Sequence, residues 1–249
     1  MRKGLNAAAL GLLLAGCGAP PARLPGSHPG AVPPASPPAA APDARGAAYR
    51  IDAAHSELRL LVYRAGAMAA LGHDHVIVNR ALEGWVRFSG DVAGAAFSLT
   101  LPTSGFVVDD EAARRQEGAD FSEVIDADAR AGTLRNMLGP AVLDAQAHPA
   151  ITVRSVSIAT ATATAQAQAA GAAQAAGAAQ ATVRVSVAGH ESSLIVPFTV
   201  DSSPGRLHAQ VDLTVQQTRL GLTPFSVFLG ALRVEDQLHV KLDLVAVQD

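Results

Sequence analysis

Apolar and polar positions alternate through most of the chain after residue 48, which is typical of β-strands with one buried face. The alternation is cleanest near the end, where Leu238, Val240 and Leu242 are separated by His239 and Lys241. Comparable runs occupy residues 58–63, 82–89, 97–101, 151–153, 183–187, 194–200 and 211–215. About eight such runs, mostly in an order that suits antiparallel pairing, predict a closed β-barrel or a β-sandwich.

The apolar spacing changes between residues 109 and 149 and becomes helical. Five apolar residues recur there at helical spacing: Leu134, Met137, Leu138, Ala141 and Val142. Asp126 and Asp128 precede them and are candidate N-caps. Pro140 cannot continue a helix, so we expect two short helical pieces rather than one long helix. The chain is therefore predicted to be all-β with a small helical insertion that packs on the sheet as a plug.

Two stretches lack the side chains that a core requires. Residues 17–47 hold nine of the fifteen prolines, and this composition predicts an extended, semi-rigid tether. Residues 159–181 contain only Ala, Thr, Gln and Gly, with a repeated Ala-Ala-Gly-Ala-Ala-Gln unit. We interpret them as a low-complexity insertion in a hairpin loop. The folded domain is then expected to occupy residues 48–249.

The first residues resemble the signal sequence of a bacterial lipoprotein. Arg2 and Lys3 make the start of the chain basic. The apolar run that follows, residues 5–15, is too short to span a bilayer as a stable helix. The run ends in Leu14-Ala15-Gly16-Cys17, which is similar to a lipobox. The resemblance implies that residues 1–16 are removed and that Cys17 carries lipid. An ordinary signal peptide with an accidental cysteine is the alternative.

The lipobox resemblance also implies a location. Several acyl chains anchor a protein stably, and Gly18 in place of an aspartate favours the outer membrane over the inner one. We therefore expect the protein in the bacterial cell envelope, attached to the outer membrane by its N-terminal lipid and facing the periplasm. Cys17 is the only cysteine, so an intramolecular disulfide is excluded.

The charge of the chain argues against a nucleic-acid partner. The formal net charge is −3, and it becomes −5 when Arg2 and Lys3 are removed with residues 1–16. Lys241 is then the only lysine, and the sequence contains no basic patch of the kind that grips phosphate backbones. Electrostatic attraction to an anionic membrane surface is equally unexpected.

The main polar cluster of the sequence lies at residues 71–79, between two strand-like arms. It contains His73, His75 and Asn79, and its position between apolar arms predicts a turn or a strand mouth. We expect these three side chains to hydrogen-bond, either to hold the loop or to meet the polar end of a ligand. A turn without any binding role is the other interpretation.

A metal site is an alternative use of the same cluster. His73 and His75 form a His-x-His pair, whose members would point to one face of a strand. Two ligands do not make a site. A third would have to come from His55, His208 or His239.

A second candidate binding point lies near Arg219. Beside apolar Leu220 and Leu222, its guanidinium could be a buried cation that recognises an anionic or quinone-like head group. A strand-end arginine with its head in water is the alternative. Phe225 belongs to an apolar loop, residues 222–232, that could line an opening.

The sequence offers little for catalysis. It has no Gly-x-Ser-x-Gly, no phosphate-binding loop and no His-Glu-x-x-His. The acidic residues 109–111 and 117–120 are interpreted as solvated loop charges. A spatial constellation of His, Asp and Ser is the remaining alternative. We therefore expect a binding protein, not an enzyme.

Several segments, in the right order, resemble the YceI-like family of periplasmic, polyisoprenoid-binding proteins. They are Tyr49-Arg50-Ile51-Asp52 with His55-Ser56, Leu143-Asp144-Ala145 with His148-Pro149, Ile151-Thr152-Val153-Arg154-Ser155, residues 187–198, and Arg219-Leu220-Gly221. The resemblance implies an eight-stranded, antiparallel, lipocalin-like barrel around a long apolar cavity. It implies an isoprenoid lipid as the bound molecule and no catalytic cofactor. A quinone is the other candidate, because of the cation at Arg219.

Three functions follow as hypotheses. The first is an envelope lipoprotein that binds or carries an apolar, isoprenoid-type lipid in the barrel. The second is a periplasmic metal-binding protein that uses His73 and His75. The third is a structural envelope module with a solid core. The volume inside the barrel separates the third from the first.

Overall fold

The computed structural model describes residues 46–160 and 178–248. The predicted signal sequence, Cys17, the predicted tether up to residue 45 and the middle of the alanine-rich segment lie outside these residues. Ala47, the last residue of the predicted tether, belongs to the first strand. The strands are β1 Ala47–Ile51, β2 Glu57–Ala65, β3 His75–Asn79, β4 Glu83–Phe88, β5 Ala96–Pro102, β6 Phe106–Val108, β7 Ala150–Thr160, β8 Ala178–Val187, β9 His190–Ser203, β10 Arg206–Gln216, β11 Ser226–Val227 and β12 Leu232–Gln248. The helices are α1 Glu111–Gln116 and α2 Ala127–Leu138.

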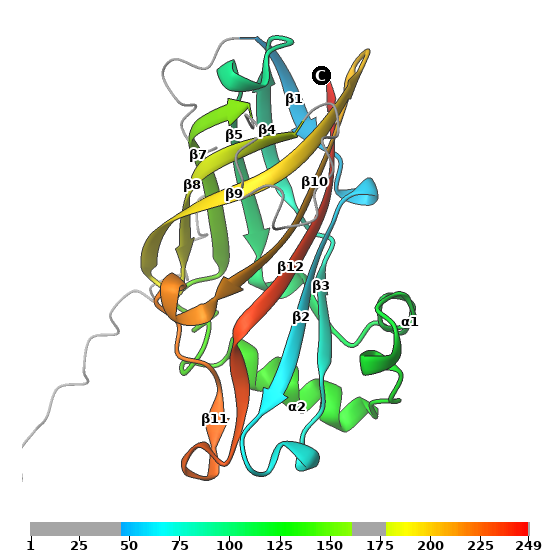
Figure 1. The fold of residues 1–249 in the computed structure, drawn as a ribbon, viewed down its shortest axis with the longest axis vertical. Helices are drawn as coiled ribbons and strands as arrows, with labels where there is room; N and C mark the ends of the chain where they lie inside the picture. Colours follow the sequence, from blue (N-terminus) through cyan, green and yellow to red (C-terminus); the bar gives the residue numbers. More distant parts are fainter. Residues whose placement is uncertain (1–45, 161–177, 249) are drawn as a thin grey trace, which may run out of the picture. The chain divides into compact units, whose positions relative to one another are not determined.

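Eight antiparallel strands form a closed barrel (Figure 1). Their order is β1-β4-β5-β7-β8-β9-β10-β12, and pairing between β1 and β12 closes the ring. The predicted eight-stranded, lipocalin-like barrel is thus confirmed, and two short α-helices accompany it within the described residues. The alternating runs of the sequence correspond to these strands, because each presents one face to the barrel interior.

The long strand β12 joins two parts of the barrel. Its residues 246–248 pair with β1, whereas residues 233–243 pair with β2. Beyond β2 the sheet continues through β3 to β6, where it ends. Helix α2 packs beside this part of the sheet (Figure 1). Its Leu134, Met137 and Leu138 lie against the core cluster that contains Phe106 and Val108 of β6. The predicted plug therefore closes one side of the barrel.

The outer face of β2 and β3 is also buried. Leu61, Val76 and Val78 form a small core with Ala113 of α1 and with Phe121. This second apolar layer explains why all five residues of β3 are buried. It also fixes β3 in place, since both of its faces are packed.

Helix α2 begins as expected but ends earlier. The Asp126 side chain caps it by accepting a hydrogen bond from the amide of Ala129 at 2.8 Å. The helix stops at Leu138, and Gly139 is extended, with φ −70° and ψ 168°. The residue before a proline is driven out of the helical region, so Pro140 ends the helix. The second helical piece predicted after Pro140 was wrong, because residues 140–147 form turns.

The ends of the alanine-rich segment belong to the barrel. Strand β7 continues to Thr160 and β8 starts at Ala178, and the two pair as a hairpin. Ala179 and Ala181 are buried in the main core cluster. The boundaries 159 and 181 were therefore too wide, because alanine fits a tightly packed strand as well as a loop. Residues 161–177 lie outside the described part of the chain.

Within residues 46–160 and 178–248, no helix is long and apolar enough to cross a membrane.

Candidate ligand cavity

The barrel encloses an apolar cavity of about 570 Å³. Leucine, valine, isoleucine and phenylalanine side chains from the inner faces of the strands make most of its wall. Among them are Leu58, Leu60, Val62, Ile77, Phe97, Phe106, Val153, Val183, Leu194, Val211, Leu213, Leu222, Phe225, Leu238, Val240 and Leu242. Several of them, such as Leu60 and Val240, are only half-buried because they face open space instead of packed neighbours. The interior of the barrel is therefore hollow, and the hypothesis of a solid core does not fit it.

A second, smaller cavity of about 90 Å³ lies further along the barrel. Five side chains line both cavities and form the partition between them: Phe97, Leu99, Val196, Val211 and Leu242. All five are apolar, so the two spaces are successive compartments of one apolar interior. Rotation of these side chains would lengthen the space available to a slender molecule.

Helix α2 supplies one wall of the larger cavity. Ala129, Gly132, Thr133, Asn136 and Met137 line it, at the spacing of one helical face. A Cβ added to Gly132 would meet only the end of the Arg135 side chain, at 3.8 Å. The wall is therefore open at Gly132.

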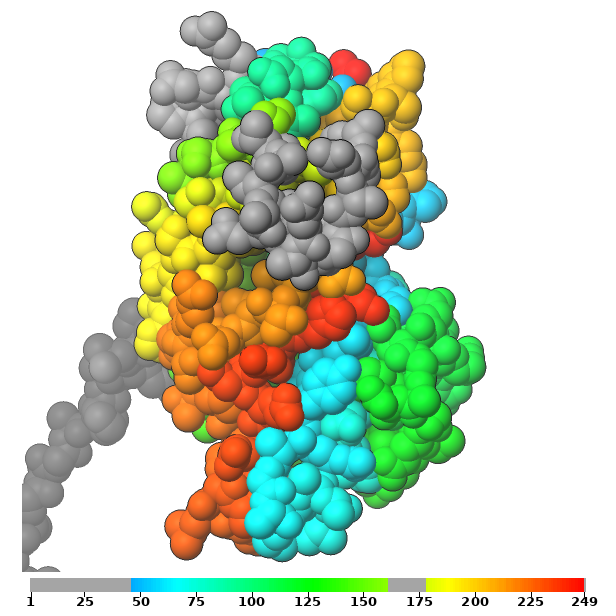
Figure 2. All heavy atoms as spheres, in the orientation of Figure 1, coloured from blue at the N-terminus to red at the C-terminus, as the bar shows by residue number. Residues whose placement is uncertain are grey.

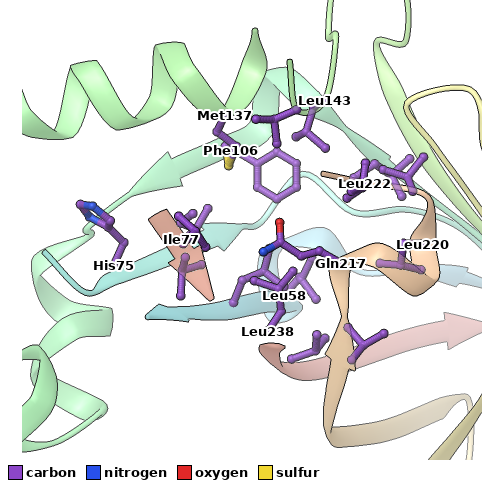
Figure 3. Close-up of a pocket in the computed structure, with 18 of the residues that line it drawn as sticks. Leu58, His75, Ile77, Phe106, Met137, Leu143, Gln217, Leu220, Leu222 and Leu238 are labelled. Carbon is purple, nitrogen blue, oxygen red and sulfur yellow. The ribbon is translucent and has the colours of Figure 1, made fainter. Parts of the chain in front are cut away.

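His75 lies at one end of the cavity (Figure 3). A buried carboxylate, that of Asp109, holds its ring. The imidazole Nδ1 lies 2.7 Å from Asp109 Oδ2. The other oxygen, Asp109 Oδ1, accepts from the amide of Val76 at 3.0 Å and from Arg114 Nη1 at 2.5 Å. Burial alone would raise the pKa of Asp109, but hydrogen bonds from His75, from the Val76 amide and from Arg114 together lower it.

These contacts determine what His75 presents to the cavity. A carboxylate only accepts, so His75 Nδ1 carries the proton and donates it to Asp109. In the neutral ring Nε2 is then an acceptor, and it lies 3.3 Å from the hydroxyl of Thr133 on α2. A ligand hydroxyl could donate to the same nitrogen. The end of the cavity is thus built to receive a hydrogen-bond donor.

A second polar group, Gln217, lies inside the apolar wall. It follows β10, and its Nε2 donates to the carbonyl of Glu235 at 2.7 Å. Figure 3 shows its carboxamide oxygen directed into the cavity, between Phe106 and Leu58. The amide is buried, so this oxygen is a fixed acceptor in otherwise apolar surroundings.

His73 also lines the cavity, but it precedes β3 and so does not share a strand face with His75. Its Nδ1 lies 3.3 Å from Glu123 Oε1 without the geometry of a hydrogen bond. The two imidazole centroids are 6.2 Å apart.

The metal hypothesis gains no third ligand from the structure. His55 bonds to Asp52, His208 to Asp243 and His239 to Asp212. No group of three His, Cys, Asp or Glu side chains within the described residues is arranged to hold a metal ion.

The other predicted site residues lie in three different environments. Phe225 lines the cavity. Asn79 is fully buried outside the cavity wall, where it donates to the carbonyl of Pro102 and accepts from the amide of Ala81, both at 2.9 Å. Its amide therefore holds the turn before β4. Arg219 is exposed and is not part of the wall, although Leu220 is.

Sequence reasoning missed Asp109, Arg114 and Gln217. The interpretation of residues 109–111 and 117–120 as solvated loop charges was wrong for Asp109 and for Glu117. Asp109 is buried against His75, and the Glu117 carboxylate pairs with Arg59 at 2.6 Å and with Lys241 at 2.5 Å. The next residue, Asp110, is the N-cap of α1, and nothing in the sequence distinguishes the buried carboxylate of Asp109 from this partly exposed neighbour.

The chain is similar to known proteins along most of its length. Residues 49–246 match the family model of the YceI-like domain. BcnA from Burkholderia cenocepacia has a similar structure, with 15% identity and a TM-score of 0.55 over 79% of this chain and 99% of that one. A polyisoprenoid binding domain from Saccharophagus degradans has 13% identity and a TM-score of 0.51, over 82% and 99%.

No curated protein matches the sequence. At such low identities the two solved structures establish the fold, which is the barrel described above. The family match covers more than half of the chain and extends from β1 to β12. The chain therefore belongs to the YceI-like family.

Proposed function

We propose that this protein binds an isoprenoid-type lipid, with the chain in the barrel cavity and the polar end at His75. The observation that carries the proposal is the cavity of about 570 Å³, whose wall is almost entirely aliphatic and aromatic. A volume of this size is typical of sites that bury a small molecule. The printed description of the Saccharophagus degradans relative, a polyisoprenoid binding domain, supports the same class of ligand.

The polar groups favour a ligand with one hydroxyl-bearing end. His75 Nε2 can accept a hydrogen bond at one end of the cavity. The wall also carries the polar side chains of Arg64, His73, Thr133, Asn136, Gln217 and Arg233, and the rest of its lining is apolar. A prenol or a quinol would satisfy both features. No group of the site is arranged as a nucleophile with an oxyanion hole, so binding without chemistry describes the cavity best.

We further propose that the protein acts from the cell envelope as a lipoprotein. The support is the sequence Leu14-Ala15-Gly16-Cys17 followed by the proline-rich residues 17–47. The expected result is that the mature N-terminal peptide begins at Cys17 and carries lipid, as measured by mass spectrometry. In Cys17→Ser that peptide should carry no lipid, and an unmodified peptide in the parent protein would contradict the proposal.

The test of lipid binding is mass spectrometry of organic extracts from the purified protein. We expect an isoprenoid lipid in amounts comparable to the protein. The matched variant is Gly132→Leu, whose side chain would enter the open part of the wall. Leucine favours helix over glycine by roughly 0.8 kcal/mol, so the fold should be retained. Equal lipid recovery from Gly132→Leu and the parent would place the lipid elsewhere.

A further inference from the structure

We propose that one end of the barrel, the tip formed by residues 68–72, 123–124 and 226–231, docks into the surface of a lipid bilayer. Phe228 and Leu229 lie at the turn between β11 and β12. The Phe228 side chain is 66% exposed, and the Leu229 side chain is fully exposed. Both have left-handed backbones, with φ of 51° and 55°. Large side chains are rare in this conformation, and glycine or asparagine would fill such a turn with less strain. The turn thus holds two large apolar groups in water at a conformational cost.

Two more exposed apolar side chains lie at the same tip. Leu71 is 67% exposed on the turn that follows β2, and this turn contacts the β11–β12 hairpin through the amide of Met68, which donates to the carbonyl of Ala231 at 2.8 Å. Val124 is 93% exposed and follows Glu123, whose carboxylate is 3.3 Å from His73. Figure 2 shows the hairpin, in orange, beside the turn after β2, in cyan.

The distribution of exposed apolar groups is uneven. Of the seven large hydrophobic side chains that are exposed in the described part of the chain, four belong to this tip. The other three, Val107, Val156 and Ile195, are single residues on the strands β6, β7 and β9. Scattered single residues are ordinary at a protein surface, whereas a cluster at the end of one element indicates a partner.

The tip is continuous with the ligand cavity. Gly72 and His73 follow Leu71 directly, and Leu232 and Arg233 follow the β11–β12 turn; all four line the cavity. A Cβ on Gly72 would lie 3.0 Å from Leu232 Cδ1, so the two loops meet there. An apolar molecule that enters at this end would pass between the exposed apolar groups.

The chemistry of the tip fits a bilayer better than a protein partner. A specific protein interface buries at least about 1,200 Å² in total, and it is flat enough to exclude water. Four protruding side chains on separate loops do not form such a face, but they can enter the interfacial region of a bilayer. Arg233 is exposed, and its guanidinium makes no hydrogen bond or ion pair within the described residues, so it can meet a lipid phosphate.

The inference rests on the proposed function in one respect, since the bilayer would supply the lipid that the barrel binds. Contact between the tip and a bilayer can be measured whether or not a lipid is bound in the cavity. The probe is tryptophan fluorescence in the full chain, mixed with phosphatidylcholine vesicles whose acyl chains are brominated. Trp85 is the only natural tryptophan, so the background is Trp85→Phe. The reporter is Phe228→Trp, and the control is Ile195→Trp, which starts from an equally exposed position, 66%, on the outer wall of the barrel.

We expect brominated vesicles to lower the emission of the Phe228→Trp reporter by about twofold or more relative to unbrominated ones. The control should change by less than about a tenth. Equal quenching of the two reporters, or none in either, would overturn the inference. The protein could instead sediment as a dimer that Phe228→Ser dissociates, with no quenching of the reporter. This result would identify the tip as a protein interface and would also overturn the inference.

The same preparations separate this inference from the proposed function. Quenching of the reporter in a protein that yields no lipid on extraction would retain the docking surface and reject the ligand. Recovery of lipid on extraction without quenching of the reporter would retain the ligand and reject the docking surface. Phe228→Ser combined with Leu229→Ser should slow transfer of a fluorescent prenol from vesicles by about tenfold, whereas Val156→Ser with Ile195→Ser should leave it unchanged.

Discussion

His75 and Asp109 are 34 residues apart in the chain, and their side chains meet at 2.7 Å beneath the cavity wall. Asp109 lies just beyond β6, which pairs with β3, so the barrel itself brings the carboxylate to the imidazole. Arg114 completes the arrangement and neutralises the carboxylate. Asp109 therefore positions the ring, and the imidazole edge that faces the cavity remains available to a ligand.

Removal of the imidazole should weaken ligand binding more than it weakens the fold. An uncompensated neutral hydrogen bond contributes on the order of 1 kcal/mol, and one to a charged group up to about 3. We therefore expect His73→Ala with His75→Ala to raise the dissociation constant for a long-chain prenol about ten- to a hundredfold. His75→Ala alone should account for most of this change, because His73 lacks a comparable hydrogen bond at the cavity.

The matched control for this prediction is His55→Ala. His55 also bonds to an aspartate, Asp52, but it is exposed and does not line the cavity. Titration of prenol into each variant, monitored by calorimetry, measures the dissociation constants. If His75→Ala binds prenol with the affinity of the parent protein, His75 has a structural role and does not contact the ligand.

Replacement of Asp109 should destabilise the protein in a pH-dependent way. The pKa of Asp109 is lowered in the folded protein, so its ionised form stabilises the fold at pH values above its unfolded pKa, about 3.9. This contribution is lost as the pH falls through the lower, folded pKa. Asp109→Asn leaves Arg114 without its charge partner and should cost about 3 kcal/mol at pH 7. The difference from the parent should shrink below pH 4.

Urea unfolding at pH 7 and pH 3 measures this effect. The control is Asp128→Asn, an exposed aspartate in the first turn of α2, for which a change within about 0.5 kcal/mol is expected. A penalty for Asp109→Asn that is the same at both pH values would mean that the charge of Asp109 does not contribute.

The sequence predicted the barrel because its period-two pattern is a property of each strand alone. Leu238 to Leu244 reads as a strand whatever its neighbours are. The hollow interior could not be predicted, because an inward leucine shows the same pattern against a packed core and against a cavity. Leu60 and Val240 differ from core residues only in the space opposite them.

Some residues of the cavity wall were named from the sequence, but their role in binding stays a prediction. His73 and His75 were chosen because polar residues lie between apolar arms, and Phe225 because it belongs to an apolar loop; all three line the cavity. Asp109 escaped notice, since its partner is distant in the sequence and β3–β6 pairing alone brings them together. Asn79 stood out equally, but its amide bonds to the backbone of Ala81 in the next turn and of Pro102 at the end of β5, because a short amide side chain can satisfy backbone groups as well as a ligand.

Glu117 should matter to stability far more than its sequence position indicates. Its carboxylate is almost fully buried, bonds to Arg59 and Lys241, and has a pKa lowered by both cations despite burial. Glu117→Gln would leave Lys241 without the carboxylate it pairs with and Arg59 with Glu57 alone, at an expected cost of about 2 kcal/mol. Glu111→Gln removes an exposed pair with Arg115 at 3.9 Å and should cost at most about 0.5 kcal/mol. Similar midpoints of urea unfolding for the two variants would contradict the assignment.

The alanine-rich segment provides a final prediction about where the barrel ends. Replacement of residues 161–177 by a four-residue turn should change the free energy of unfolding by about 1 kcal/mol, the scale of loop-closure entropy. A deletion extended to residues 159–181 also removes the pairs Ala159–Gln180 and Thr160–Ala179 and the buried Ala181. Lost core contacts and strand pairing should then cost more than about 2 kcal/mol. Thermal unfolding of both deletions tests this difference, and equal stability would mean that the hairpin end does not contribute to the core.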